Sequence, residues 1–92
     1  MRYDYDPAKD AANLDKHGLS LADAALVYEA AGKITLFSPR ENEDRRMDVA
    51  LVEVAGVVLA LVYVERGDVV RPISLRRASR QERRLYEDAK QD

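Results

Sequence analysis

The sequence predicts an α+β domain in which helices pack on one antiparallel sheet. Helix start signals dominate the first 32 residues, Val- and Leu-rich runs separated by short turns fill most of residues 47–77, and one more helix start follows. With 92 residues and a hydrophobic fraction of 47%, the chain suits a single domain over residues 1–92.

The first helix is predicted over residues 7–17. Asp6 is a favoured N-cap residue, and Pro7 at the first helical position loses no hydrogen bond because that N–H has no helical partner. Gly18 is well suited to end the helix, since glycine adopts the left-handed conformation there without strain.

Two further helices are predicted from capping signals. Ser20 and Asp23 resemble a capping box and predict a second helix that ends near residue 31. Ser79 and Glu82 form a full capping box and predict a last helix that ends near residue 90.

The strands are predicted from short apolar runs between turns. A weak alternation at residues 2–5 indicates an edge strand, and the other candidates are residues 34–37, 47–54, 57–65 and 69–77. Pro72 lies inside the last run and cannot donate a ladder hydrogen bond, so we expect an edge or a bulge there. With a turn at Gly67-Asp68, Tyr63 lies opposite Pro72, and simple alternation then places Tyr63, Ser74 and Arg76 on one face.

Composition excludes several classes of site. The chain has no cysteine and one histidine, which excludes disulfides, thiolate metal sites and a His-rich zinc site. The acidic cluster of Glu41, Glu43, Asp44 and Asp48 is better explained as solvated loop carboxylates than as a metal site. The longest apolar run, residues 57–64, is too short to cross a membrane, and no secretory leader is evident, so we expect a cytoplasmic protein without a cofactor.

Charge is distributed unevenly along the chain. Residues 1–65 carry 7 Lys and Arg against 12 Asp and Glu, whereas residues 66–92 carry 8 against 5. A local arginine cluster on a protein of net charge −2 indicates one focused anion site, although a solvated charged face has the same composition.

Cleavage of RNA without a metal ion is the chemistry that these residues fit. It needs a base for the 2′-hydroxyl, an acid for the leaving 5′-oxygen, and cations for the charge on the phosphorane. Lys16, His17, Tyr63, Tyr86 and the arginine cluster could fill these roles. His17 could equally cap the carbonyls at the end of its helix, and Tyr86 could pack the last helix on the sheet.

The chain resembles the BrnT family of type II toxins over about residues 3–88. The matching elements are Asp6-Pro7-Ala8-Lys9, Asn13, Lys16-His17-Gly18, Asp44-Arg45-Arg46, Val62-Tyr63, Glu65-Arg66-Gly67-Asp68, and most of residues 71–87. It departs from the family pattern at Pro72 and Leu75.

The resemblance implies a RelE-like fold and a metal-independent endoribonuclease that inhibits translation. With the resemblance, the residues expected to act in catalysis are Lys16, His17, Arg46, Tyr63, Arg76 and Arg80, and those expected to bind RNA are Arg71, Ser74, Arg77, Arg83 and Tyr86. It also implies a cognate BrnA-like antitoxin with a ribbon-helix-helix fold, through which the complex would bind DNA. The alternative is a toxin fold that has lost catalysis and only binds an antitoxin-like partner. Direct binding to DNA is disfavoured by the net charge and by the lack of a helix-turn-helix pattern.

Overall fold

The computed structural model describes residues 2–37, 45–52 and 55–91. Its elements follow the predicted order: β1 (Arg2–Tyr3), α1 (Pro7–His17), a 3₁₀ turn (Leu21–Asp23), α2 (Ala24–Tyr28), β2 (Ile34–Phe37), β3 (Arg45–Val52), β4 (Val57–Arg66), β5 (Val69–Arg77) and α3 (Arg80–Lys90). The α+β prediction is confirmed, and the arrangement is consistent with a RelE-like fold.

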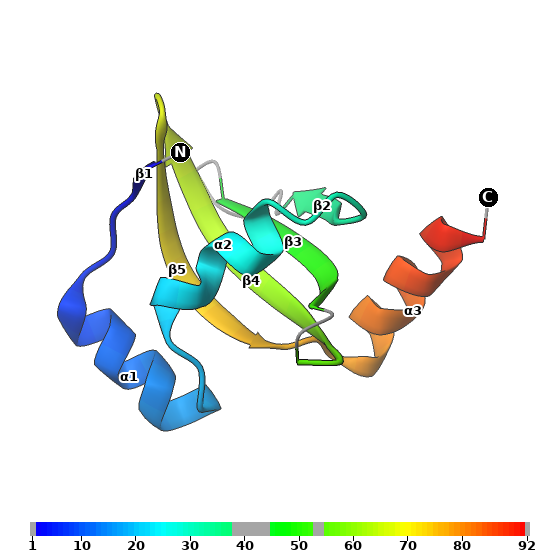
Figure 1. The fold of residues 1–92 in the computed structure, drawn as a ribbon, viewed down its shortest axis with the longest axis horizontal. Coiled ribbons are helices and arrows are strands. Elements are labelled where there is room, and N and C mark those ends of the chain that lie inside the picture. The colour runs from blue at the N-terminus through cyan, green and yellow to red at the C-terminus, as the bar shows by residue number, and fades with distance from the viewer. Residues whose placement is uncertain (1, 38–44, 53–54, 92) are drawn as a thin grey trace.

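The sheet has the strand order β1-β5-β4-β3-β2. Strands β2 to β5 form an antiparallel meander, whereas β1 pairs with β5 in parallel. The sheet is therefore mixed, a feature that the repeated hairpin pattern did not predict. In Figure 1, α2 lies across one face of the sheet, α1 lies beside the β5 edge, and α3 lies apart from both, on the β3 side.

The helix caps form as predicted. Asp6 accepts a hydrogen bond from the Ala8 N–H at 2.8 Å, and Gly18 ends α1 in the left-handed conformation with φ 71°. Both bonds of the predicted capping box between Ser79 and Glu82 are present at the start of α3.

The second predicted helix is shorter than expected. Residues 21–23 form a 3₁₀ turn, and α2 ends at Tyr28 rather than near residue 31. After this turn, Lys33 forms an ion pair with the buried carboxylate of Asp48, with 2.7 Å between Nζ and Oδ2. A Cβ atom at Gly32 would collide with the end of the Lys90 side chain, so glycine suits this close approach.

A β-bulge interrupts the β4–β5 pairing beside Pro72. Tyr63 pairs with Pro72 as predicted, but Val62 pairs with Ser74, which leaves Ile73 without a partner on β4. The bulge is confirmed at the position where a proline lacks the ladder N–H.

The bulge makes the predicted grouping of Tyr63, Ser74 and Arg76 on one face wrong. Residues paired across strands share a face, so Tyr63 lies with Pro72, whereas Ser74 and Arg76 lie with Val62 on the other side. The extra residue inverts the alternation and brings Arg71 onto the same face as Ser74 and Arg76.

The core contains buried residues of the sheet, the 3₁₀ turn and α2, and Tyr86 of α3. Leu21, Ala24 and Val27 are fully buried against residues such as Leu61 and Leu75. The side-chain amide of Asn13 in α1 forms the two hydrogen bonds that a neighbouring strand would form with Leu75 at the outer edge of β5. It donates to the Leu75 carbonyl at 2.8 Å and accepts from the Leu75 N–H at 3.0 Å. This pair of bonds fixes α1 beside β5.

Candidate functional site

A groove of about 280 Å³ lies where α1 meets the outer edge of β5. Its α1 side carries Lys9, Lys16 and His17, and its β5 side carries Ile73 and Ser74. Within the described part of the chain, the lining contains three basic side chains, a hydroxyl and an amide, and no carboxylate. Such a lining suits a phosphate group.

Lys16 and His17 occupy the last turn of α1, as predicted from the sequence. The C-terminal end of a helix carries a partial negative charge, which stabilises positively charged side chains there. Lys16 is exposed and His17 is half-buried. The structure thus brings together Lys16 and His17, predicted for catalysis, and Ser74, predicted for RNA binding.

Ser74 also belongs to one face of the β4–β5 pair. Through the register, Arg71, Ser74 and Arg76 share that face, which is opposite to the face that contacts α2. We call these three residues, together with Lys16 and His17, the cationic site. Arg71 makes only a long ion pair with Asp4, 3.5 Å between Nη1 and Oδ2, and both side chains are well exposed.

Arg76 forms a bidentate ion pair with Glu82. Its Nη1 and Nη2 atoms donate to the two carboxylate oxygens at 2.7 and 2.8 Å. The hydrogen bonds from Arg76, together with those from the Ser79 backbone and hydroxyl, lower the pKa of Glu82 to about 2. The hydrogen bonds with Glu82 raise the pKa of Arg76. The Arg76 guanidinium therefore stays charged and is ion-paired with the Glu82 carboxylate.

We expect this ion pair to make the fold sensitive to acid. Because the pKa of Glu82 is lowered from 4.5 to about 2, its stabilisation is complete above pH 4.5 and is lost as the pH falls towards 2. A Glu82→Gln variant keeps the capping box but loses the ion pair, so it should be less stable by up to about 3 kcal/mol at pH 6. Urea unfolding of both proteins at pH 6, 4 and 2.5 measures the difference. A difference that stays constant down to pH 2.5 would contradict the lowered pKa.

The remaining basic residues of the C-terminal segment surround the start of α3. Arg77, Arg80 and Arg83 are exposed to solvent. Tyr86 is only 9% exposed and belongs to the core, and the cation over its ring is Lys90 at 5.4 Å rather than Arg83.

Arg46 and Tyr63 do not join the cationic site but pair with each other across β3 and β4 on the opposite face. Tyr63 is 1% exposed, and its hydroxyl donates to Asp48 at 2.9 Å. Burial and the Asp48 carboxylate raise the pKa of Tyr63 well above its ordinary value. Arg46 forms an ion pair with Glu65 at 3.1 Å and lies over the ring of Phe37.

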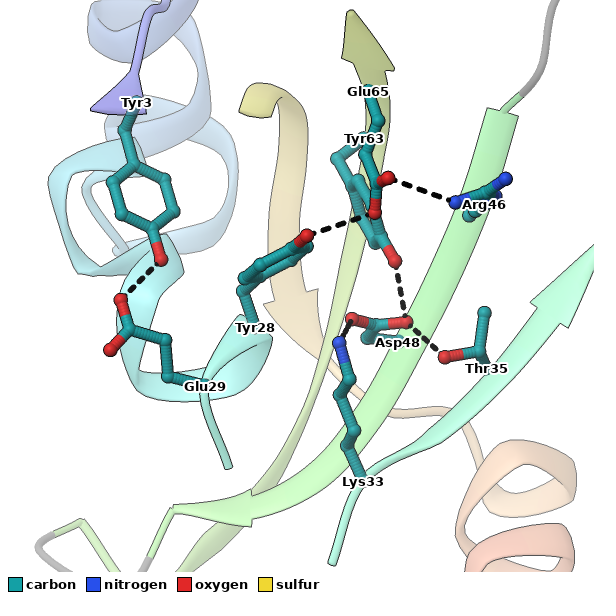
Figure 2. Close-up of polar contacts among 9 residues, drawn as sticks. All are labelled: Tyr3, Tyr28, Glu29, Lys33, Thr35, Arg46, Asp48, Tyr63 and Glu65. Atoms are coloured by element: carbon teal, nitrogen blue, oxygen red, sulfur yellow. Dashed lines mark hydrogen bonds and ion pairs between the residues drawn. The ribbon is translucent and has the colours of Figure 1, made fainter. Parts of the chain in front are cut away.

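Asp48 is the centre of a buried polar network that was not predicted from the sequence. It is fully buried and accepts hydrogen bonds from Lys33 and Thr35 at 2.7 Å, in addition to that from Tyr63 (Figure 2). The prediction that Asp48 is a solvated loop carboxylate is wrong, because Asp48 lies inside β3 and is fully buried. Its position within the apolar run of residues 47–54 was the signal for a buried carboxylate. Its predicted cluster partners Glu41, Glu43 and Asp44 lie outside the described residues.

Three tyrosines extend this network towards β1. Tyr28 packs edge-on against both Tyr3 and Tyr63, with ring centroids 6.1 and 5.2 Å apart. Tyr3 donates to Glu29 and Tyr28 donates to Glu65 (Figure 2). The network joins β1, α2, β2, β3 and β4, which is a structural role for this face.

A second hollow of about 380 Å³ lies between the end of α2, β3 and α3. Its lining is mainly apolar, including Leu26, Leu51 and Val52, and Lys90 is its one charged residue among those described. The smaller groove beside α1 has more basic residues in its lining, so it is the better candidate for binding an anionic ligand.

No helix in the described ranges is long and apolar enough to cross a membrane. A small α+β protein with this strand order is consistent with a RelE-like fold, and three of its basic residues line the groove at the edge of β5. The model of the BrnT family, described as the ribonuclease toxin BrnT of type II toxin-antitoxin systems, matches residues 5–82, and the chain belongs to this family. A search of curated proteins finds no match to the chain.

Membership makes the chain a BrnT ribonuclease toxin of a type II toxin-antitoxin system. Membership in this class of toxins implies an RNA substrate and a cognate antitoxin.

Proposed function

We propose that this toxin is a metal-independent endoribonuclease that inhibits translation, and that its cationic site binds the scissile phosphate. The observation that carries the proposal is the groove beside α1, where Lys9, Lys16 and His17 face Ser74 with no carboxylate among the described lining residues. A basic lining attracts the RNA backbone and repels a divalent cation, so it favours proton transfer by side chains over metal chemistry.

The reaction would use Lys16 and His17, which line the groove, together with Arg76 and Arg80, which lie outside its lining. The 2′-oxygen of one nucleotide attacks the adjacent phosphorus, and the bond to the 5′-oxygen breaks, which leaves a 2′,3′-cyclic phosphate and a 5′-hydroxyl. His17 and Lys16 are the candidates to remove the proton from the 2′-oxygen and to supply one to the 5′-oxygen. Arg76 and Arg80 are the candidates to stabilise the charge on the phosphorane.

The other basic residues would hold nucleotides on either side of the cleaved bond. Arg71 and Ser74 share one face of the sheet with Arg76, and Arg77 and Arg83 are exposed to solvent. The proposal leaves out Arg46, Tyr63 and Tyr86, because the first is ion-paired on the opposite face and the two tyrosines are buried.

The proposed antitoxin has a ribbon-helix-helix fold, as the antitoxin BrnA would. It would neutralise the toxin by covering the cationic site with an acidic segment, and the complex would reach DNA only through the antitoxin.

Cleavage of RNA in the presence of EDTA tests this proposal. We expect the purified chain to cut a single-stranded RNA in EDTA, and we expect Lys16→Ala to lower the rate at least tenfold without a change in thermal stability. Arg66→Ala is the matched control, since Arg66 is an exposed cation at the end of β4, outside the groove lining. A rate that depends on added Mg²⁺ would contradict the metal-independent mechanism.

A second candidate function is a toxin fold that only binds its antitoxin. It is favoured by the observation that Arg46, Arg71 and Arg76 are each paired with a carboxylate of the same chain. Absence of cleavage by a folded wild type, on several RNAs and with ribosomes present, would favour this candidate.

A further inference from the structure

We infer that Lys9 is a positioning residue that binds the RNA phosphate next to the one held at Lys16 and His17. This inference rests on the proposed function, because it gives the groove a second phosphate subsite. Lys9 was not among the residues that the charge pattern selected, since it lies outside the C-terminal arginine cluster.

The helix geometry places Lys9 and Lys16 along one groove. Lys9, Ala12, Asn13 and Lys16 all line it, which is the i, i+3, i+4, i+7 pattern of a single helix face. Seven residues of helix separate Lys9 from Lys16 by about 10 Å along the axis. This separation suits contacts with two phosphates of one strand better than two contacts with the same phosphate.

Asn13 is the reason that this face is aligned with the sheet edge. Its amide is bonded to both the N–H and the carbonyl of Leu75, at 3.0 and 2.8 Å, and is nearly fully buried. Lys9 and Lys16 lie one turn before and nearly one turn after this anchor, so both ends of the groove are held at a fixed distance from Ser74.

The charge of Lys9 is available to a ligand. Its side chain is exposed, and within residues 2–37, 45–52 and 55–91 it has no ion pair or hydrogen bond. The nearby carboxylates are already engaged: Asp6 caps α1, and Asp10 accepts from the Ser20 hydroxyl and from the Leu21 N–H at 2.7 Å. Lys9 thus forms no direct ion pair within the described part of the chain, in contrast to Arg71 and Arg76.

A contact with a phosphate that does not react is made equally in the ground state and in the transition state. Loss of such a contact raises KM and leaves kcat unchanged. It also reduces the number of counterions released on binding, so the dependence of affinity on salt becomes less steep. A purely structural role for Lys9 predicts neither effect.

The test measures binding and cleavage by Lys9→Ala, Lys9→Arg and the control Arg66→Ala. Binding is measured with a single-stranded 2′-O-methyl RNA, which cannot be cut because its 2′-oxygens are blocked. We expect Lys9→Ala to bind about five- to tenfold more weakly and to lower the slope of log K against log salt by about 0.7. Lys9→Arg should restore both, and the KM of Lys9→Ala should rise while its kcat stays within twofold of the wild type.

An affinity and salt slope of Lys9→Ala equal to those of Arg66→Ala would overturn the inference, whether or not the wild type cleaves RNA. The binding arm does not need cleavage, so it tests Lys9 even if the proposed nuclease activity fails. Conversely, a cleaving wild type with an unaffected Lys9→Ala variant would reject the second subsite and leave the proposed function standing.

Discussion

Replacement of His17 by Gln should lower the kcat of RNA cleavage by about 100-fold or more, the usual contribution of a general acid or base. His17 is half-buried in the groove at the end of α1, beside Lys16 and opposite Ser74. Glutamine has similar hydrogen-bonding atoms but cannot exchange a proton near neutral pH. The loss should therefore appear in kcat, with KM changed much less.

Single-turnover cleavage of a labelled RNA measures this effect, and the melting temperature of each variant controls for folding. Arg66→Ala serves again as the control for loss of a surface cation. A His17→Gln protein that keeps more than half of the wild-type rate would show that His17 only caps α1, the alternative that the sequence left open.

Replacement of Asp48 by Ala should destabilise the fold by about 3–5 kcal/mol, the largest effect on stability that we expect. Asp48 is fully buried and accepts from Lys33, Thr35 and Tyr63. Removal of the carboxylate leaves a half-buried ammonium group and two hydroxyl groups without their partner. For a domain of this size, that loss corresponds to a fall in melting temperature of more than 10 °C.

Thermal and urea unfolding measure this change. Asp15→Ala is the matched control, because Asp15 is an exposed carboxylate on α1, and it should change stability by less than about 0.5 kcal/mol. The stability of Asp48→Asn should lie between those of Asp48→Ala and Asp15→Ala, since asparagine keeps an acceptor oxygen but lacks the charge opposite Lys33. If Asp48→Ala were as stable as Asp15→Ala, the network would not support the sheet.

Local signals predicted most of the secondary structure. The caps at Asp6 and Ser79, the left-handed Gly18 and the limits of β5 all depend on a few neighbouring residues, and all four are confirmed. Strand β3 starts two residues before the predicted position, because Arg45 and Arg46 pair with Val64 and Tyr63 on β4.

The candidate site could be predicted only in part. The proximity of Lys16 and His17 follows from their adjacency on a helix. Their proximity to Ser74, more than 50 residues away in the sequence, follows from the Asn13–Leu75 hydrogen bonds, and no local pattern contains that contact.

The sequence pattern was sufficient for the class of fold, the element order and the location of positive charge, because periodicity and capping act over a few residues. The assignment of side chains to faces was decided by the tertiary structure. One unpaired residue, Ile73, separates Tyr63 from Ser74 and unites Arg71 with Ser74 and Arg76. A strand alternates with a period of two, so a single bulge inverts the face of every later residue, and only pairing with the neighbouring strand determines where that bulge forms.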